Sequence, residues 1–281
     1  MTPMVRSSAT PPPPSPSDAQ LGHRNLIAFN RALTRWGSRG ALEEGGGAVL
    51  CAGGTWIPVV ANGAFRSDDA LDGTELIARA DAFFAGLGRG FGIKVRDSGE
   101  DEDLRRACTD AGLELFGGRV PEMICRSPLP APPPAHGVAL HWVDDEAGVR
   151  DFIAVNAAAY ATYGMPAEVL SDLFDEPALM LGDPAASIVV ARRAAGPVAT
   201  AMTYESDGVA SLQWVGTVPA ARTAGLGTLV TVLATNLAFA HGASSCTLQA
   251  SPMGEPIYLR LGYETIYRYE EFVRWPRPPG H

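Results

Sequence analysis

Residues 215–228 combine glycines, hydroxyl groups and one arginine in an order that suits the binding of a phosphate group. They read V-G-T-V-P-A-A-R-T-A-G-L-G-T, which predicts a strand, a tight turn and then a helix. The first N–H groups of a helix have no partner within the helix, and its dipole adds partial positive charge there. Gly225 and Gly227 let the backbone approach phosphate oxygens, and Arg222 can add a charged hydrogen bond. We therefore expect a pyrophosphate-binding turn, although glycines in such a turn can also serve only to reverse the chain.

A second segment with reactive side chains follows at residues 251–263, which read S-P-M-G-E-P-I-Y-L-R-L-G-Y. The phenol of Tyr258 has an ordinary pKa near 10, so it can donate a proton to a basic leaving group. The alternative for Tyr258 is a packing role on a short helix beside Leu259 and Leu261. Its position three residues before a Leu-Gly-Tyr exit favours the catalytic interpretation.

Together the two segments resemble the two signatures of the GNAT acyltransferase superfamily. The first is similar to the coenzyme A-binding pattern R/Q-x-x-G-x-G/A with its V-x-P-x-x-R lead-in, and Thr217 replaces the usual valine. The second is similar to N-x-x-A-x-x-x-Y-x-x-x-G-F, and Ser251 and Gly254 replace the asparagine and the alanine. Pro256 lies inside this second signature and suggests a late or distorted helix start. The resemblance covers roughly residues 137–275.

The resemblance implies an N-acetyltransferase that moves an acetyl group from acetyl-CoA to a primary amine by direct attack. In that family the strand before the turn binds the pantetheine arm and the acyl carbonyl, the turn holds the pyrophosphate, and a tyrosine protonates the departing thiolate. The tyrosine falls on Tyr258. The residues implied in acetyl-CoA binding are Val215, Gly216, Thr217, Arg222, Thr223, Ala224, Gly225, Leu226, Gly227, Thr228 and Ser251.

The general base and the acceptor are not identified by the sequence. The strand at 211–217 has no Asp or Glu, and Gln213 cannot take a proton. Deprotonation of the amine would then need a more distant group acting through water, for which Glu205, Glu270 and Glu271 are candidates, each equally a surface carboxylate. The missing carboxylate and the serine at 251 leave an alternative open, a non-catalytic acyl-CoA-binding or regulatory module.

Composition narrows the class of protein. With 281 residues and 46% hydrophobic side chains, the chain can form one large core or two of ordinary size. The four cysteines are far apart and the histidines form no HxxH pair, so we expect no metal site. The net charge of −9 argues against nucleic acid and anionic membranes as partners. Only strand-length apolar runs occur and no secretory signal is evident, so we expect a cytoplasmic protein with a small-molecule or peptide amine acceptor.

Proline-rich segments divide the chain. Residues 1–18 predict a disordered tail, and residues 129–136 predict a linker between an N-terminal domain at 19–128 and an acyltransferase domain at 137–281. The fold class expected is α/β of the α+β type, with mixed sheets and flanking helices. The predicted C-terminal elements are strands at 137–143, 186–192, 198–204, 209–217 and 246–250, helices at 146–160, 166–174, 225–241 and 255–260, and a strand pair at 263–275.

The N-terminal half predicts a degenerate copy of the same fold. Residues 92–95 and 101–111 repeat the strand and helix order of the second signature, and a glycine again follows. The helix expected at 71–84 then corresponds to the coenzyme A helix. Carboxylates at Asp68, Asp69 and Asp72 would stabilise its start but repel a pyrophosphate, so we expect one coenzyme A per chain. An unrelated α/β domain is the alternative.

Overall fold

The computed structural model describes residues 17–132 and 135–276. The predicted disordered tail at 1–18 lies outside these residues except for its last two. Ser17 caps the first helix, α1 (Asp18–Arg35): its side chain accepts the backbone N–H of Gln20, whose side chain in turn accepts the N–H of Ser17. Residues 133 and 134 of the predicted linker also lie outside the described residues.

The two halves of the chain repeat one order of elements, as the sequence predicted. In the N-terminal half, β3–α3–β4–α4–β5 has the same order as β9–α8–β10–α9–β11 in the C-terminal half. The predicted strand pair at 263–275 is wrong, because these residues form one long strand, β11. The N-terminal elements are β1 (Ala41–Gly45), β2 (Ala48–Ala52), α2 (Pro58–Ala61), β3 (Asn62–Arg66), α3 (Gly73–Gly86), β4 (Phe91–Arg96), α4 (Glu102–Asp110) and β5 (Glu114–Cys125).

The C-terminal elements begin after the proline-rich segment and match most of the predicted ranges within a few residues. They are β6 (Ala139–Trp142), α5 (Glu146–Tyr160), η1 (Ala161–Tyr163), α6 (Glu168–Leu173), α7 (Pro177–Leu181), β7 (Ala186–Arg193), β8 (Gly196–Ser206), β9 (Val209–Thr217), η2 (Pro219–Ala221), α8 (Leu226–Ala240), β10 (Ser245–Gln249), α9 (Glu255–Leu261) and β11 (Glu264–Arg274). The predicted helix at 166–174 corresponds to the shorter α6, and α7 was not predicted.

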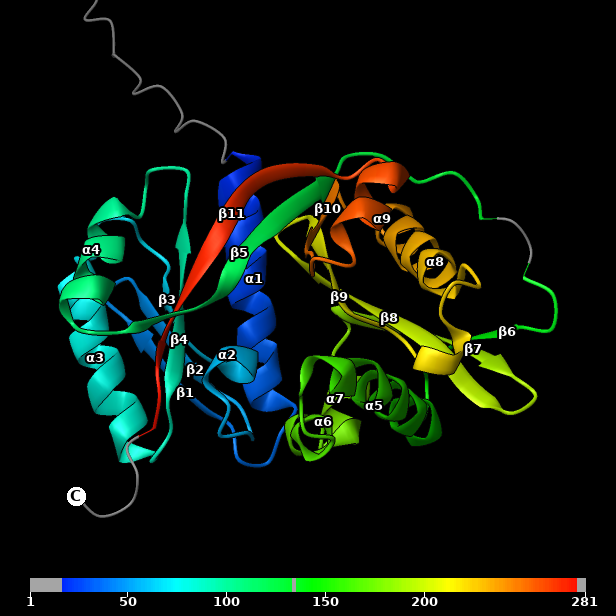
Figure 1. Cartoon of the computed structure of the whole chain (residues 1–281), viewed down its shortest axis with the longest axis horizontal. Helices are drawn as coiled ribbons and strands as arrows, with labels where there is room; N and C mark the ends of the chain where they lie inside the picture. The colour runs from blue at the N-terminus through cyan, green and yellow to red at the C-terminus, as the bar shows by residue number, and fades with distance from the viewer. Residues whose placement is uncertain (1–16, 133–134, 277–281) are drawn as a thin grey trace, which may run out of the picture.

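Within the described residues, all strands join one mixed sheet in the order β1-β2-β3-β4-β11-β5-β10-β9-β8-β7-β6. The last strand of each half is exchanged. Strand β5 lies between β10 and β11, and β11 lies between β5 and β4. Figure 1 shows these two long strands side by side, crossing from one lobe to the other. The predicted tandem fold with flanking helices is confirmed, and the exchange fuses its two sheets into one.

Helices cover both faces of the sheet. In the C-terminal half α8 packs on one face of β7–β9, and α5, α6 and α7 pack on the other. In the N-terminal half α3 and α4 cover one face and α1 covers the other. Helix α1 also reaches the C-terminal half, where Nδ2 of Asn25 donates to the carbonyls of Tyr204 and Val209 at 3.2 and 2.9 Å. The halves are therefore held together by α1 as well as by the exchanged strands.

Candidate functional site

The site begins where two parallel strands separate. Strands β9 and β10 pair only from Ser245↔Val209 to Thr247↔Ser211. Beyond this point β9 contains a bulge, because its pairing with β8 gains one residue between Gln213 and Gly216. Trp214 in this bulge has φ 50°, a left-handed conformation that is uncommon for a residue with a side chain. The bulge interrupts the ladder and leaves an opening between β9 and β10.

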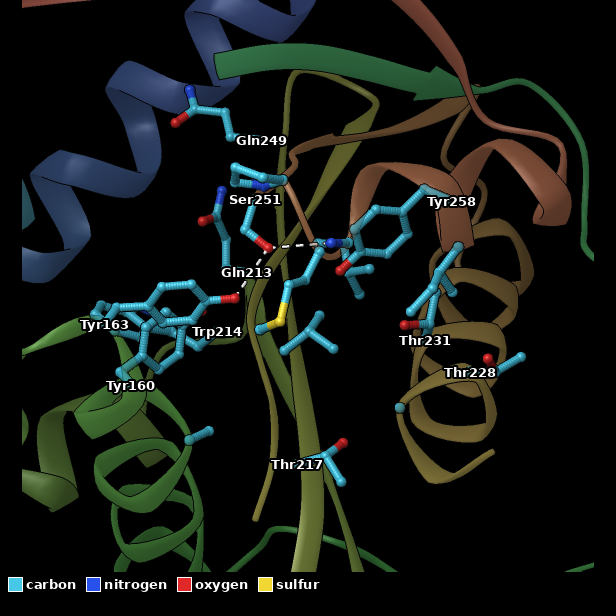
Figure 2. A pocket seen from close by; sticks show the side chains of 18 of the residues that line it. Tyr160, Tyr163, Gln213, Trp214, Thr217, Thr228, Thr231, Gln249, Ser251 and Tyr258 are labelled. Carbon is cyan, nitrogen blue, oxygen red and sulfur yellow. Dashed lines mark hydrogen bonds between the residues drawn. The ribbon is translucent and has the colours of Figure 1, made fainter. Parts of the chain in front are cut away.

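A cavity of about 890 Å³ occupies this opening, and the structure brings most of the predicted site residues to its wall (Figure 2). Two predicted residues do not line it. Gly216 faces α5, and a Cβ at this position would lie only 2.6 Å from Oδ1 of Asn156, so the glycine is required by packing. Ala224 is exposed in the turn. The predicted residues that line the cavity are Val215, Thr217, Arg222, Thr223, Gly225, Leu226, Gly227, Thr228, Ser251 and Tyr258.

The start of α8 presents free backbone N–H groups to the cavity. Gly225 is the N-cap with φ 73°, no side chain caps the helix, and its first turn has no acidic residue. The first bond of the helix is donated by the N–H of Leu229 to the carbonyl of Gly225 at 2.9 Å. The N–H groups of residues 226–228 therefore have no acceptor within the helix, which makes this end suited to an anion. A Cβ at Gly227 would lie 3.2 Å from Oγ1 of Thr217, so the helix also packs closely on β9.

Arg222 fastens the turn before α8 to the end of α5. Its Nη2 donates to the carbonyl of Ala159 at 3.2 Å and to Oγ1 of Thr162 at 3.1 Å. The guanidinium is thus partly engaged within the protein, while Arg222 still lines the cavity. Its positive charge adds to that of the helix start, so this end of the cavity attracts negative charge.

Tyr258 projects from α9 into the cavity opposite Thr231 of α8 (Figure 2). Its ring packs edge-on against Tyr263, with 5.8 Å between the ring centroids. Burial raises the pKa of Tyr258 well above its usual 10, so the phenol stays protonated throughout the physiological range. The structure therefore places a neutral proton donor in the cavity wall.

The departures from the second signature have local physical reasons. A Cβ at Gly254 would lie 2.8 Å from Cε2 of Tyr258, so alanine there would clash with this ring in its present position. Pro256 lies in the first turn of α9, where proline is tolerated, and the helix begins at Glu255 rather than late. Oγ of Ser251 accepts the N–H of Gly254 at 3.2 Å and the hydroxyl of Tyr163 at 3.4 Å. Ser251 thus orders the start of α9 at the cavity.

Aromatic side chains form the wall opposite α9. Tyr160 packs edge-on against Trp214 with 5.4 Å between centroids, and Tyr163 lies 6.1 Å from Tyr160. Burial raises the pKa of Tyr160 to about 12. Trp142, which is exposed on β6, and Tyr204, which is buried in the core, do not line the cavity. The wall combines apolar ring surface with hydroxyl groups.

No carboxylate lines the cavity among the residues that the structure describes. The three candidate bases are engaged elsewhere. Glu205 contacts Nδ1 of His241 at 2.8 Å, Glu270 pairs with Arg105 and Arg119, and Glu271 pairs with Lys94. Sequence reasoning missed Gln249, which lines the cavity, and Glu122, which lies directly opposite it on β5.

Glu122 is buried behind the cavity wall. Its Oε2 has no hydrogen-bond partner, and burial raises the pKa of its carboxyl to about 8. The carboxyl is therefore neutral at pH 7 and is no ready proton acceptor at that pH. No sequence signal could have indicated this, because Glu122 meets Gln249 only through the pairing of β5 with β10.

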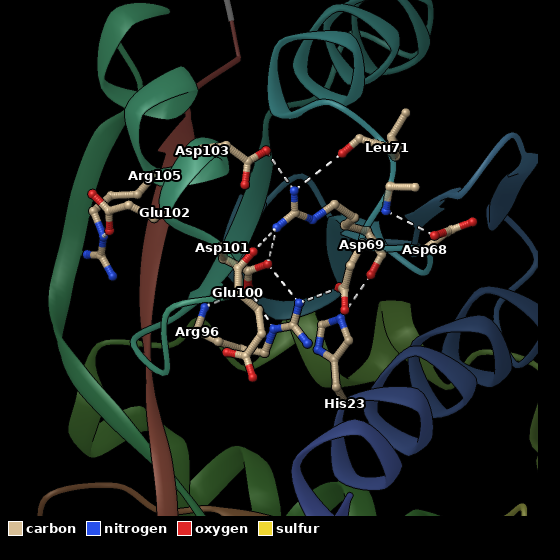
Figure 3. A network of polar contacts seen from close by, with 12 residues as sticks. His23, Asp68, Asp69, Leu71, Arg96, Glu100, Asp101, Glu102, Asp103 and Arg105 are labelled. Atoms are coloured by element: carbon tan, nitrogen blue, oxygen red, sulfur yellow. Dashed lines mark hydrogen bonds and ion pairs between the residues drawn. The ribbon is translucent and has the colours of Figure 1, made fainter. Parts of the chain in front are cut away.

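The corresponding opening in the N-terminal half, between β3 and β4, is closed by ion pairs (Figure 3). Arg66 at the end of β3 and Arg96 at the end of β4 both bind Asp101, with Nε of Arg96 2.7 Å from the carboxylate. Asp103 and Asp69 pair with the same two arginines at 2.7 and 2.8 Å. Burial raises the pKa of Asp101, but hydrogen bonds from the arginines outweigh this and hold the pKa at about 2.

The start of α3 also differs from the start of α8. Asp72 is its N-cap, and Oδ1 of Asp72 accepts the N–H groups of Thr74 and Glu75 at 2.9 and 3.3 Å. The free N–H groups of this helix thus bind a carboxylate of the same chain. This arrangement agrees with the prediction that the N-terminal half lacks a phosphate cradle.

Within the described residues, one group of His and carboxylate side chains comes together, at His141, Asp144 and Asp145. It is exposed and does not line the cavity, and Asp145 in it accepts the N–H of Gly148 as the cap of α5. Among the described helices none has the length and hydropathy needed to cross a membrane.

Comparison with known proteins agrees with this geometry. Residues 134–253 match the family model described as an acetyltransferase (GNAT) domain. A GCN5-related N-acetyltransferase from Kribbella flavida superposes with a TM-score of 0.66 at 21% identity, over 92% of this chain and 96% of that one. A GCN5-related N-acetyltransferase from Sphaerobacter thermophilus gives 0.58 at 15%, over 85% and 83%. A tandem GNAT protein from the clavulanic acid biosynthesis pathway also gives 0.58 at 15%, over 94% and 97%. No curated protein matches the sequence.

Proposed function

We propose that the protein transfers an acetyl group from acetyl-CoA to a primary amine by direct attack, a proposal that the match of residues 134–253 to the GNAT acetyltransferase family model supports. The observation that supports this best is the position of two features on one cavity. The uncapped start of α8 offers N–H groups for a pyrophosphate, and Tyr258 offers a neutral phenol. An anion site and a proton donor on the same cavity suit the binding and cleavage of an acyl-CoA thioester.

The residues at the cavity have distinct proposed roles. The N–H groups of residues 226–228 and the charge of Arg222 would hold the pyrophosphate of acetyl-CoA. The edge of β9 at 215–217, which no neighbouring parallel strand occupies, would bind the pantetheine arm by backbone hydrogen bonds. Ser251 would act by ordering the loop that carries Tyr258.

The chemistry follows from these positions. The neutral amine nitrogen attacks the thioester carbonyl, a C–N bond forms, and the electron pair of the carbonyl moves to its oxygen. When this intermediate collapses, the C–S bond breaks and the thiolate takes the proton of Tyr258. The proton of the amine leaves through water, since no carboxylate among the described residues lines the cavity. Tyr258 then recovers a proton from solvent.

The acetyl-CoA site can be tested at Thr228, the third residue of α8. A glutamate there suits the helix dipole, so Thr228→Glu should fold, but its carboxylate would compete with and repel the pyrophosphate. We expect acetyl-CoA affinity to fall on the order of 100-fold, whereas Thr228→Gln, of the same size without charge, should bind nearly as wild type. Calorimetry measures both variants. Unchanged affinity in Thr228→Glu would contradict the site.

Valine at Gly225 and Gly227, the direct way to fill the turn, is a poor test. Gly225 has φ 73°, which a β-branched residue adopts only with strain, and Gly227 packs against Thr217.

Titration of the wild-type protein with acetyl-CoA in the calorimeter should give one acetyl-CoA per chain, because the N-terminal cleft is closed. Release of coenzyme A with a panel of amines then separates an enzyme from a non-catalytic binding module, which would bind acetyl-CoA without turnover.

A further inference from the structure

The cavity does not end at the opening between β9 and β10 but continues to the N-terminal half. Its wall includes Asn30 of α1, Val59 and Val60 of α2, and Lys94 of β4. We infer that the amine acceptor binds between the two halves and is a monoamine with an apolar body, an inference that rests on the proposed function. The N-terminal half would then build the acceptor site, although its own cleft is closed.

The apolar part of the wall comes from both halves. Val59 and Val60 are half-buried on α2, and they share the cavity with Met165 and the rings of Tyr160 and Trp214. Leu26, Phe29 and Leu33 of α1 lie behind them and are almost fully buried. Contact with such a surface favours an acceptor that buries apolar surface over one that carries many polar groups.

The charges in the wall disfavour a second ammonium group on the acceptor. The charged residues that line the cavity are Lys94, Arg222 and Arg260, all cationic, and no carboxylate is among the described lining residues. Nζ of Lys94 lies 3.0 Å from Oε1 of Glu271, and Glu271 itself does not reach the cavity. A second ammonium would be desolvated without a carboxylate partner in the described wall, which is costly.

An unsatisfied polar atom of this wall agrees with this inference. Nε1 of Trp214 is a buried donor without a hydrogen-bond partner, and Trp214 lines the cavity. Donors of this kind suit an oxygen atom of a ligand and repel an ammonium group. An amine with an apolar body, with or without a carbonyl or ether oxygen, therefore fits the wall better than a polyamine or an aminoglycoside.

A matched pair of amines tests the acceptor class directly. Butylamine and 1,4-diaminobutane have the same carbon chain and differ in the second ammonium group, and 2-phenylethylamine adds a larger apolar body. With saturating acetyl-CoA, we expect kcat/KM for coenzyme A release to be on the order of 100-fold higher for the monoamines than for the diamine. Equal or faster turnover of the diamine overturns the inference. So does the absence of both turnover and binding for all the monoamines.

Substitution on α2 tests the location. Val60→Glu places a carboxylate in the wall and should raise the ratio of diamine to butylamine turnover at least ~10-fold, because the second ammonium gains a partner. Val60→Gln, of the same size without charge, should keep the wild-type ratio. If Val60→Glu does not fold, Val59→Glu repeats the test from the neighbouring position. An unchanged ratio in the folded variant places the acceptor elsewhere.

These results are distinguishable from failure of the proposed function. If wild-type protein does not bind acetyl-CoA in calorimetry, the proposed function itself is wrong. If acetyl-CoA binds and polyamines are acetylated efficiently, the function stands and only the acceptor class is wrong.

Discussion

The two halves of this protein share an order of elements but differ in what fills the opening between their parallel strands. In the C-terminal half the opening holds a cavity, and the start of α8 has no side-chain cap. In the N-terminal half Arg66, Arg96 and Asp101 close the opening, and Asp72 caps α3. The first N–H groups of both helices need acceptors. One half satisfies them with its own carboxylate, and the other leaves them available to a ligand.

The comparison shows that one order of elements can hold either an open cavity or a cleft closed by ion pairs. The two halves differ here in their side chains. The N-cap is glycine in one and aspartate in the other, and within the described residues paired charges fill only the N-terminal cleft. The N-terminal half keeps two structural roles, because it exchanges a strand with its partner half and supplies α1 and α2 to the cavity wall.

Separation of the halves should have the largest effect. Residues 137–281 alone would lack β5, which leaves β10 with an unpaired edge and β11 without either neighbour. We expect this fragment to show no cooperative thermal unfolding by circular dichroism, and co-expression with residues 17–136 to restore it. A fragment that unfolds cooperatively by itself would show that the two halves are independent domains after all.

The catalytic side is tested next by Tyr258→Phe. This change removes the proposed proton donor but keeps the ring that packs on Tyr263, so acetyl-CoA affinity should stay near wild type. We expect kcat to fall roughly 10²–10⁴-fold, because the thiolate is most basic as the intermediate collapses. The measurement is coenzyme A release with an acceptor found for the wild type. Turnover equal to that of wild type would leave Tyr258 with a packing role only.

The sequence was sufficient to predict what local patterns determine. Helical periodicity and the flanking glycines located α8 within a few residues, and short apolar runs between turns located the strands β7, β8 and β9. The two signatures predicted a set of residues, most of which the structure brings to one cavity. The exchange of β5 and β11 was not predictable, because strand pairing between distant segments has no local signal. For the same reason neither Glu122 nor the contribution of α2 to the cavity was foreseen.

Removal of the central carboxylate in the closed cleft should be next in size. Asp101→Asn leaves Arg66 and Arg96 buried, with the more exposed Asp103 and Asp69 as their remaining carboxylate partners. Removing one partner of a buried ion pair typically costs about 3–5 kcal/mol. The free energy of unfolding should fall by this amount, which is measured as a lower midpoint of urea unfolding. Acetyl-CoA affinity should not change, because the network lies outside the cavity. A stability equal to that of wild type would show that the ion pairs merely fill space.

The last change concerns Glu122, behind the cavity wall, and its effect depends on pH. Its pKa in the folded protein is about 8 against 4.5 for an unperturbed glutamate, so between these values the folded state holds a proton that the unfolded chain has lost. The contribution of Glu122 to the free energy of unfolding is therefore largest below pH 4.5, decreases as the pH rises, and becomes constant above pH 8. Glu122→Gln should be increasingly more stable than wild type as pH rises from 5 to 8.

The readout is the difference in free energy of unfolding between Glu122→Gln and wild type, measured in urea at several pH values. Burial lowers the pKa of His23 to about 4, which makes stability rise with pH between 4 and 6.5, but this contribution is common to both proteins and cancels. The buried thiols of Cys51, Cys108 and Cys246 have pKa values near 12 in the folded protein against 9.0 unperturbed, so measurements should stay below pH 8.5. Parallel profiles for the two proteins would mean that Glu122 is ionised in the fold, with a partner that compensates its charge. The carboxyl behind Gln249 would then be available as a proton acceptor for the amine, and the proposed exit of that proton through water would need revision.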